Sequence, residues 1–161
     1  MKDLTNILSS FMLLLISSAA QAQTPIRCTV TGGGVLAAGD HFALNATATR
    51  VGNAHGSMML QTPYGYTFQS NNIELLHCTQ DGGAKADYPE APQRANFYGS
   101  GLWNGEDGYL IVVHTEDRSE PTDMDYTEIR ILDSDANLVY RAAGFLVSGN
   151  VQHYSINKGR Q

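Results

Sequence analysis

Residues 41–49 read H-F-A-L-N-A-T-A-T, and apolar and polar side chains alternate along them. Every even-numbered residue from 42 to 48 is apolar, whereas Asn45, Thr47 and Thr49 are polar. Because successive side chains of a strand point to opposite faces, this alternation predicts a β-strand with one buried face. The stretch therefore indicates a β protein.

Similar segments continue along the chain, and helical periodicity is almost absent after residue 22. Further strands are predicted over residues 57–61, 66–69, 73–79, 94–103, 109–115, 126–132, 138–142, 144–147 and 150–156. Strong turn signals separate several of them, among them Asn104-Gly105. About nine or ten strands with such regular turns predict an all-β, antiparallel β-sandwich, with a β-barrel or jelly roll as the alternative.

Residues 1–22 have the features of a secretory signal peptide. Lys2 precedes an apolar segment at 7–16, and Ala20 and Ala22 supply the small residues of a cleavage site. We expect cleavage after Ala22, which leaves residues 23–161 as a single secreted or periplasmic domain. The apolar segment is too short to cross a bilayer, so no membrane span is expected.

The chain contains two cysteines, Cys28 and Cys78. In an exported protein an even number of cysteines predicts a disulfide, here one between Cys28 and Cys78. Two free thiols are the alternative. The C-x-x-C spacing of redox motifs is absent, and no second pair could complete a zinc site.

The formal net charge is −6, and it is concentrated in one segment. Residues 106–135 contain ten acidic and two basic residues, a local net charge of −8. Nucleic-acid binding is not expected, because phosphates require a basic surface. The distribution is compatible with a cation partner or with solubility alone.

A stretch of ten residues inside this segment contains five carboxylates: Glu116, Asp117, Glu120, Asp123 and Asp125. A solvated loop is the simplest interpretation. The alternative is a Ca²⁺ site, because Ca²⁺ prefers several carboxylate oxygens on a loop and would relieve their repulsion. A third hypothesis pairs two of the carboxylates for glycoside hydrolysis. No other catalytic residue or cofactor site is predicted.

Three further motifs have structural interpretations. The sequence D-S-D-A-N at 133–137 resembles the start of an EF-hand loop, but Leu138 replaces the required glycine, so a turn is predicted. His114 is expected to be a hydrogen-bonded strand residue beside the acidic loop. The glycine run 32–34 predicts a tight turn or a close approach of two backbones.

Five short segments carry a resemblance to a known family: V-T-G-G-G at 30–34, F-A-L-N-A at 42–46, A-x-F-x-G at 95–99, W-N-G at 103–105 and G-N-V-Q at 149–152. Together they resemble the post-COAP modules of bacterial secreted and cell-surface proteins. The resemblance implies a β-sandwich module without a settled activity. Two positions depart from the pattern: Val35 stands where an aromatic residue often follows the glycines, and Thr122 stands where glycine is usual.

These observations predict a secreted or periplasmic, non-catalytic module. It would bind a cell-envelope component, a glycan or a cell-surface protein, with Ca²⁺ in the acidic loop. One alternative is a structural or accessory domain without a small ligand. The other is an extracellular hydrolase that uses the loop carboxylates.

Overall fold

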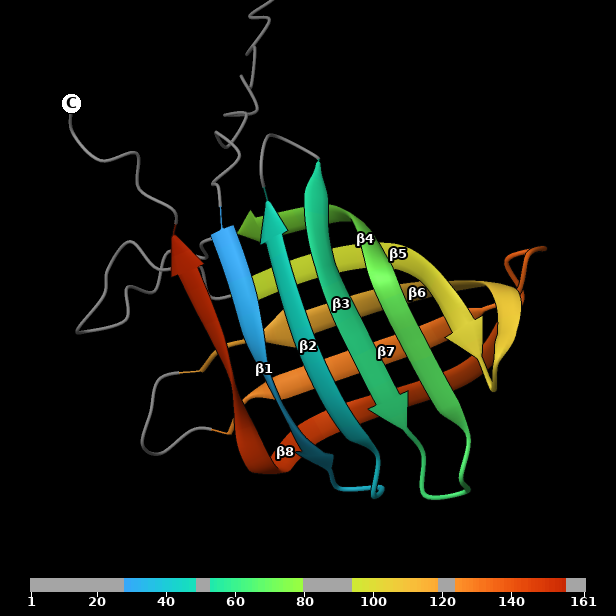
Figure 1. Ribbon diagram of the computed structural model, residues 1–161. Coiled ribbons are helices and arrows are strands. Elements are labelled where there is room, and N and C mark those ends of the chain that lie inside the picture. The colour runs from blue at the N-terminus through green and yellow to red at the C-terminus, as the bar shows by residue number, and fades with distance from the viewer. Residues whose placement is uncertain (1–27, 49–52, 80–93, 119–123, 156–161) are drawn as a thin grey trace, which may run out of the picture.

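The computed structural model describes residues 28–48, 53–79, 94–118 and 124–155, which form a closed antiparallel β-barrel. The strands are β1 (Cys28–Leu36), β2 (His41–Ala48), β3 (Ala54–Gln61), β4 (Thr67–Thr79), β5 (Arg94–Trp103), β6 (Glu106–Glu116), β7 (Tyr126–Leu132) and β8 (Leu138–Ser155). Each strand pairs with its neighbour in sequence, and β1 also pairs with β8 (Figure 1). The all-β antiparallel prediction is confirmed, and the architecture is the barrel alternative, not the sandwich.

The sheet has eight strands, fewer than the nine or ten predicted, because two predicted segments belong to β4 and three belong to β8, whereas β1 matches no predicted segment. β4 continues through two register shifts, the first between Gln69 and Asn72. β8 runs for 18 residues and passes through Gly144 and Gly149 without ending. Glycines in a sequence often indicate the end of a strand. In this barrel, glycines and β-bulges lie inside strands that continue.

The glycine run 32–34 lies inside β1 and does not form a turn. A Cβ atom added to Gly32 would lie 2.2 Å from the carbonyl oxygen of Asn150, and one on Gly33 would lie 2.5 Å from that of Phe42. The close-approach interpretation is therefore correct and the turn interpretation is wrong. Glycine is required here because β1 lies against the backbones of both β2 and β8.

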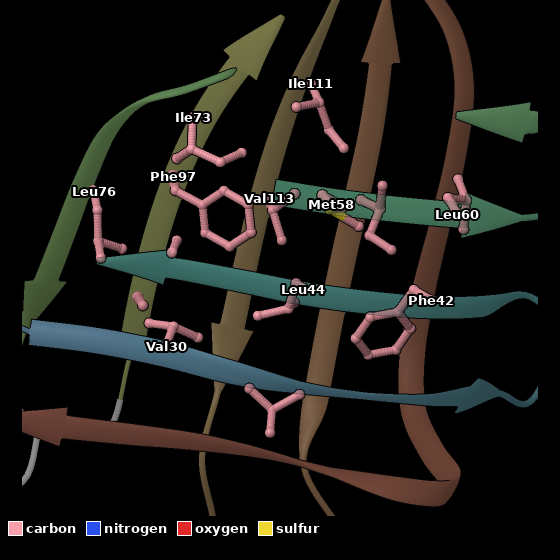
Figure 2. Packing of buried hydrophobic residues seen from close by; sticks show 14 of the residues in the cluster. Val30, Phe42, Leu44, Met58, Leu60, Ile73, Leu76, Phe97, Ile111 and Val113 are labelled. Carbon is pink, nitrogen blue, oxygen red and sulfur yellow. The ribbon is translucent and has the colours of Figure 1, made fainter. Parts of the chain in front are cut away.

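The barrel interior is filled by apolar side chains. Phe68, Phe97, Leu60 and Ile111 are fully buried, and they come from four different strands. Figure 2 shows side chains of β1 and β2, such as Val30, projecting toward those of β5 and β6 across the interior. Burial of each large side chain stabilises the fold by about 1.5–3 kcal/mol relative to leaving it exposed.

The two ends of the barrel differ. At the disulfide end, where β1 begins and β4 ends, Cys28 and Cys78 form the predicted disulfide across a sequence separation of 50. This bond joins β1 to β4, which are not hydrogen-bonded neighbours in the sheet. The free-thiol alternative is therefore wrong. We call the opposite end, formed by the turns at 37–40, 62–66, 104–105 and 133–137, the hairpin end.

Aromatic side chains pack at the hairpin end. The ring of Trp103 lies between those of Tyr66 and Tyr140, with centroid distances of 5.6 and 5.5 Å. The hydroxyl group of Tyr140 donates a hydrogen bond of 2.7 Å to the buried carboxylate of Asp40. Burial and this hydrogen bond raise the pKa of Tyr140 well above its usual value. The cluster therefore fixes the start of β8 against the β1–β2 connection.

Residues 1–22, for which a signal peptide is predicted, lie outside the described residues, as do both ends of the predicted domain 23–161. Within the described ranges the chain forms no helix that is long and apolar enough to cross a membrane.

Candidate functional site

The acidic segment that the sequence singles out begins at the end of β6. Glu116 lies on the outer surface of the barrel and accepts hydrogen bonds from the Arg118 guanidinium, the shorter at 2.6 Å. Its other oxygen lies 3.2 Å from His114 Nε2 and 3.4 Å from Arg94 Nε. Partial burial alone would raise the pKa of Glu116, but the hydrogen bonds from Arg118 and His114 outweigh it and lower this pKa. Glu116 therefore forms ion pairs with Arg94 and Arg118 and contacts His114.

The ring of His114 contacts two polar side chains, those of Asn96 and Glu116. Its Nδ1 lies 2.9 Å from Asn96 Oδ1, in addition to the contact of Nε2 with Glu116. The ring also lies 6.2 Å from that of Tyr126, measured between centroids. The expectation that His114 is a hydrogen-bonded strand residue is confirmed.

Asp117 and Asp125, in contrast, lie inside the barrel wall at the disulfide end, each with only 6% of its surface exposed. Asp117 Oδ2 accepts a hydrogen bond of 2.9 Å from the backbone N–H of His153. Asp125 accepts one of 2.7 Å from the N–H of Val151 and one of 2.9 Å from the N–H of Arg118. These hydrogen bonds thus connect Asp117 and Asp125 to the C-terminal end of β8.

Further polar groups lie beside these aspartates. The Nε2 atom of His153 lies 2.9 Å from the hydroxyl oxygen of Thr115, and both side chains are buried. Thr127 is fully buried on the neighbouring strand β7. Sequence reasoning did not identify this polar layer, although His153 follows Val151 by two positions and so falls on the inward face of β8.

The predicted Ca²⁺ ligands therefore divide into three groups. Glu116 is ion-paired on the outer surface, Asp117 and Asp125 are bound to backbone N–H groups, and Glu120 and Asp123 lie outside the described residues. Among the described residues, no three histidine, cysteine or acidic side chains are grouped so that they could hold a metal ion. The Ca²⁺ site stays a prediction, and it would depend on Glu120 and Asp123.

A second set of ion pairs lies on β7 and β8. Glu128 Oε1 accepts hydrogen bonds of 2.7 Å from Arg130 and 2.9 Å from Arg141. These two hydrogen bonds lower the pKa of Glu128. We call the outer surface of β5, β6, β7 and β8 up to Phe145, which contains both ion-pair clusters, the charged wall.

The outer surface on the other side of the barrel has a different composition. We define the uncharged wall as the outward-facing residues of the segments 29–35, 41–47, 55–61 and 148–154, which belong to β1, β2, β3 and the end of β8. These four segments contain no Asp, Glu, Lys or Arg. Figure 1 shows β1, β2 and β3 side by side across the front of the barrel.

The strand register arranges the uncharged wall in rows that cross four strands. One row contains Gln152, Thr31, Asn45 and Ser57. The row nearer the disulfide end contains Tyr154, Thr29, Thr47 and His55, and the third contains Asn150, Gly33, Ala43 and Met59. With strands about 4.8 Å apart, each row spans roughly 14 Å.

No family model, no curated protein and no solved structure matches this chain. The resemblance to post-COAP modules therefore stays a prediction.

The geometry of the described residues favours binding at the outer surface over chemistry in the interior. Interior positions hold mostly apolar side chains. The buried acids Asp117 and Asp125 accept hydrogen bonds from backbone N–H groups, and Asp40 accepts one from the Tyr140 hydroxyl group. Hydroxyl, carboxamide and aromatic groups that a partner could reach lie on the outside. The uncharged wall is therefore the candidate functional site.

Proposed function

We propose that this protein is a secreted or periplasmic, non-catalytic β-barrel module that binds a partner of the cell envelope through its outer surface. One observation carries the proposal: the barrel interior is occupied by its own side chains, while a broad outer wall presents neutral polar groups in regular rows. A surface of this kind serves recognition, because hydrogen-bonding groups on rigid strands are held in fixed positions. The single disulfide supports an oxidising compartment.

The proposal is tested with the mature chain, residues 23–161, purified in the oxidised state. Cosedimentation with isolated cell-envelope material is expected to saturate as the protein concentration rises. A linear, unsaturable association, or none, would contradict it. Fractionation of cells that produce the full chain is expected to place the protein outside the cytoplasm in a form shortened by 22 residues. An uncleaved cytoplasmic form would contradict the localisation.

The acidic loop is proposed to take up Ca²⁺ as an accessory ion. Titration calorimetry of the mature chain should then give a saturable heat with Ca²⁺, and the melting temperature should rise, since a ligand that binds only the folded state stabilises it. The double variant Glu120→Gln/Asp123→Asn should lose both effects. The absence of heat and of any shift in the unaltered protein would remove Ca²⁺ from the proposal.

A further inference from the structure

We infer that the uncharged wall binds an uncharged polysaccharide chain. This inference rests on the proposed function and names the class of partner and the surface that takes it. Three properties of the wall support it: the lack of Asp, Glu, Lys and Arg, the hydrogen-bonding capacity of its rows, and the distribution of large and small side chains over its surface.

The first property is the separation of charge between the two walls. Surfaces of soluble domains commonly contain about 25–35% charged residues, which maintain solubility. The described ion pairs of Glu116 and Glu128 all lie on the charged wall. The four segments of the uncharged wall contain no Asp, Glu, Lys or Arg, and histidine is their only basic residue type. Such a wall has no carboxylate, ammonium or guanidinium group, so a neutral partner can cover it without the cost of desolvating one of these ions.

The second property is that the side chains of the middle row can both donate and accept hydrogen bonds, although Gln152 already accepts one from the Tyr154 hydroxyl group. Thr31 and Ser57 carry hydroxyl groups, and Asn45 and Gln152 carry carboxamides. Each of these side chains contains a donor and an acceptor, as does every sugar hydroxyl. A row of such groups, fixed by the ladder hydrogen bonds of four strands, matches a chain of repeating hydroxyls.

The third property is the relief of the wall. Gly33 and Ala43 are adjacent across β1 and β2, so the centre of the third row carries almost no side chain. Met59 and Tyr154 lie at opposite edges of the wall, with 52% and 48% of their surfaces exposed. A flexible thioether and an aromatic ring of this kind can contact the C–H faces of sugar rings. The polysaccharide would therefore lie over the centre of the wall, where side chains are small, between Met59 and Tyr154.

These properties distinguish a polysaccharide from other occupants. Protein interfaces depend on a few large anchors, commonly aromatic or Arg residues, in a desolvated centre. The centre of this wall holds Thr31, Gly33 and Asn45 instead. A polyanion such as an acidic glycan is commonly bound by Lys and Arg side chains, which the four segments do not contain.

The test is affinity electrophoresis of the mature oxidised protein at pH 8, where an ordinary exposed histidine is neutral. Native gels contain dextran, mannan or a β-1,3-glucan as neutral polysaccharides, and alginate as the acidic one. At least one neutral polysaccharide is expected to retard the protein, and alginate is not. Mobility is expressed relative to a gel without polysaccharide, so that changes of protein charge cancel.

Two variants locate the binding surface. Asn45→Lys places a charge at the centre of the uncharged wall, and Asn96→Lys makes the same change at an exposed strand position of the charged wall. Asn45→Lys is expected to weaken binding at least about tenfold, because the ammonium group must be desolvated against a neutral chain. Asn96→Lys is expected to bind as the unaltered protein does. Melting curves of both variants show whether each is folded, and Thr31→Val, which removes one hydroxyl and adds no charge, should also weaken binding.

The other possible results contradict the polysaccharide inference, the proposed function or the location of the binding surface. If envelope material binds but all three neutral polysaccharides fail, the inference is wrong and the proposed function stands. If neither binds, both fail. Retardation by alginate alone, or equal loss in Asn45→Lys and Asn96→Lys, would place binding elsewhere. If sedimentation shows a dimer that only Asn45→Lys disrupts, the wall is covered by a second copy of this chain.

Discussion

Two aspartates of the acidic segment are interior residues, although the segment was interpreted as a solvated loop. The register of β6 explains Asp117, because Val113, Thr115 and Asp117 occupy alternate positions and all face inward. Asp125 precedes the inward-facing Thr127 on β7 in the same way. This alternation was present in the sequence. The backbone N–H groups of β8 that donate hydrogen bonds to these carboxylates could not be predicted, because they come from a distant part of the chain.

Asp125→Ala is expected to reduce the free energy of unfolding by about 2–5 kcal/mol. The substitution leaves the N–H groups of Val151 and Arg118 without their acceptor, and each buried unsatisfied group costs about 1–3 kcal/mol. Urea denaturation followed by fluorescence measures the change. Asp135→Ala, at an exposed position in the 133–137 turn, is the control and should change stability by less than about 0.5 kcal/mol. Equal effects of both variants would show that Asp125 has no special structural role.

Glu128 is expected to give a small, pH-dependent contribution to stability. Its pKa is lowered in the folded state by Arg141 and Arg130, so the unfolded state binds protons more readily. The contribution is therefore present above the unfolded pKa of about 4.3–4.5 and is lost as the pH falls through the folded value. Because both arginines are about half exposed, the effect should be about 1 kcal/mol or less.

The variant Glu128→Gln tests this expectation. Its stability should lie below that of the unaltered protein at pH 7, and the two should converge near pH 3. A difference that is constant between pH 3 and pH 7 would mean that Glu128 acts through packing and not through its charge.

At the scale of the strand, local alternation predicted most elements within a few residues. The predictions at 94–103 and 126–132 coincide with β5 and β7, and 41–49 differs from β2 by one residue. The errors fall where a strand bends and in β1, whose glycine run hides the strand. The pair Asn71-Asn72 in β4 and the glycines of β8 suggested breaks, because nothing in a local segment distinguishes a bend from an end.

Gly99→Ala is expected to destabilise the barrel by about 3 kcal/mol or more. A Cβ atom at this position of β5 would lie 2.1 Å from the carbonyl oxygen of Asn72, a backbone atom of the paired strand β4. Thermal and urea denaturation measure the loss. Gly105→Ala provides the comparison, because its Cβ would meet open space and only its φ of +85° opposes a side chain. It should cost about 1–2 kcal/mol. If Gly105→Ala costs more than Gly99→Ala, the close approach of β4 and β5 is not a constraint on the sequence.

At the scale of the whole molecule, closure of the sheet could not be predicted. A sandwich and a barrel show the same alternation along each strand, and they differ only in which distant strands pair. Pairing between β1 and β8 decides the matter here. The same holds for the candidate site. The lack of Asp, Glu, Lys and Arg in residues 29–35, 41–47 and 55–61 is visible in the sequence, but the position of residues 148–154 beside them is not.

The Cys28–Cys78 disulfide is expected to stabilise the barrel by about 4 kcal/mol, as the loop-closure entropy of a chain segment of this length implies. The double variant Cys28→Ala/Cys78→Ala should therefore melt at a temperature lower by on the order of 10 °C, measured by calorimetry. Reduction of the unaltered protein with a phosphine should produce a similar shift. If neither treatment changes the melting temperature, strand pairing alone determines stability.

Because the first strand pairs with the last, the strands could follow one another along the chain in a circularly permuted order. Because Cys28 and Ser155 are partners in the β1–β8 ladder, a short linker could join them without disturbing any strand. A permuted protein opened at the Asn104-Gly105 turn and rejoined in this way would begin with β6 and end with β5. Its eight strands would form the same neighbouring pairs around the barrel. The architecture is circular, and the natural starting point is one of several that would suffice.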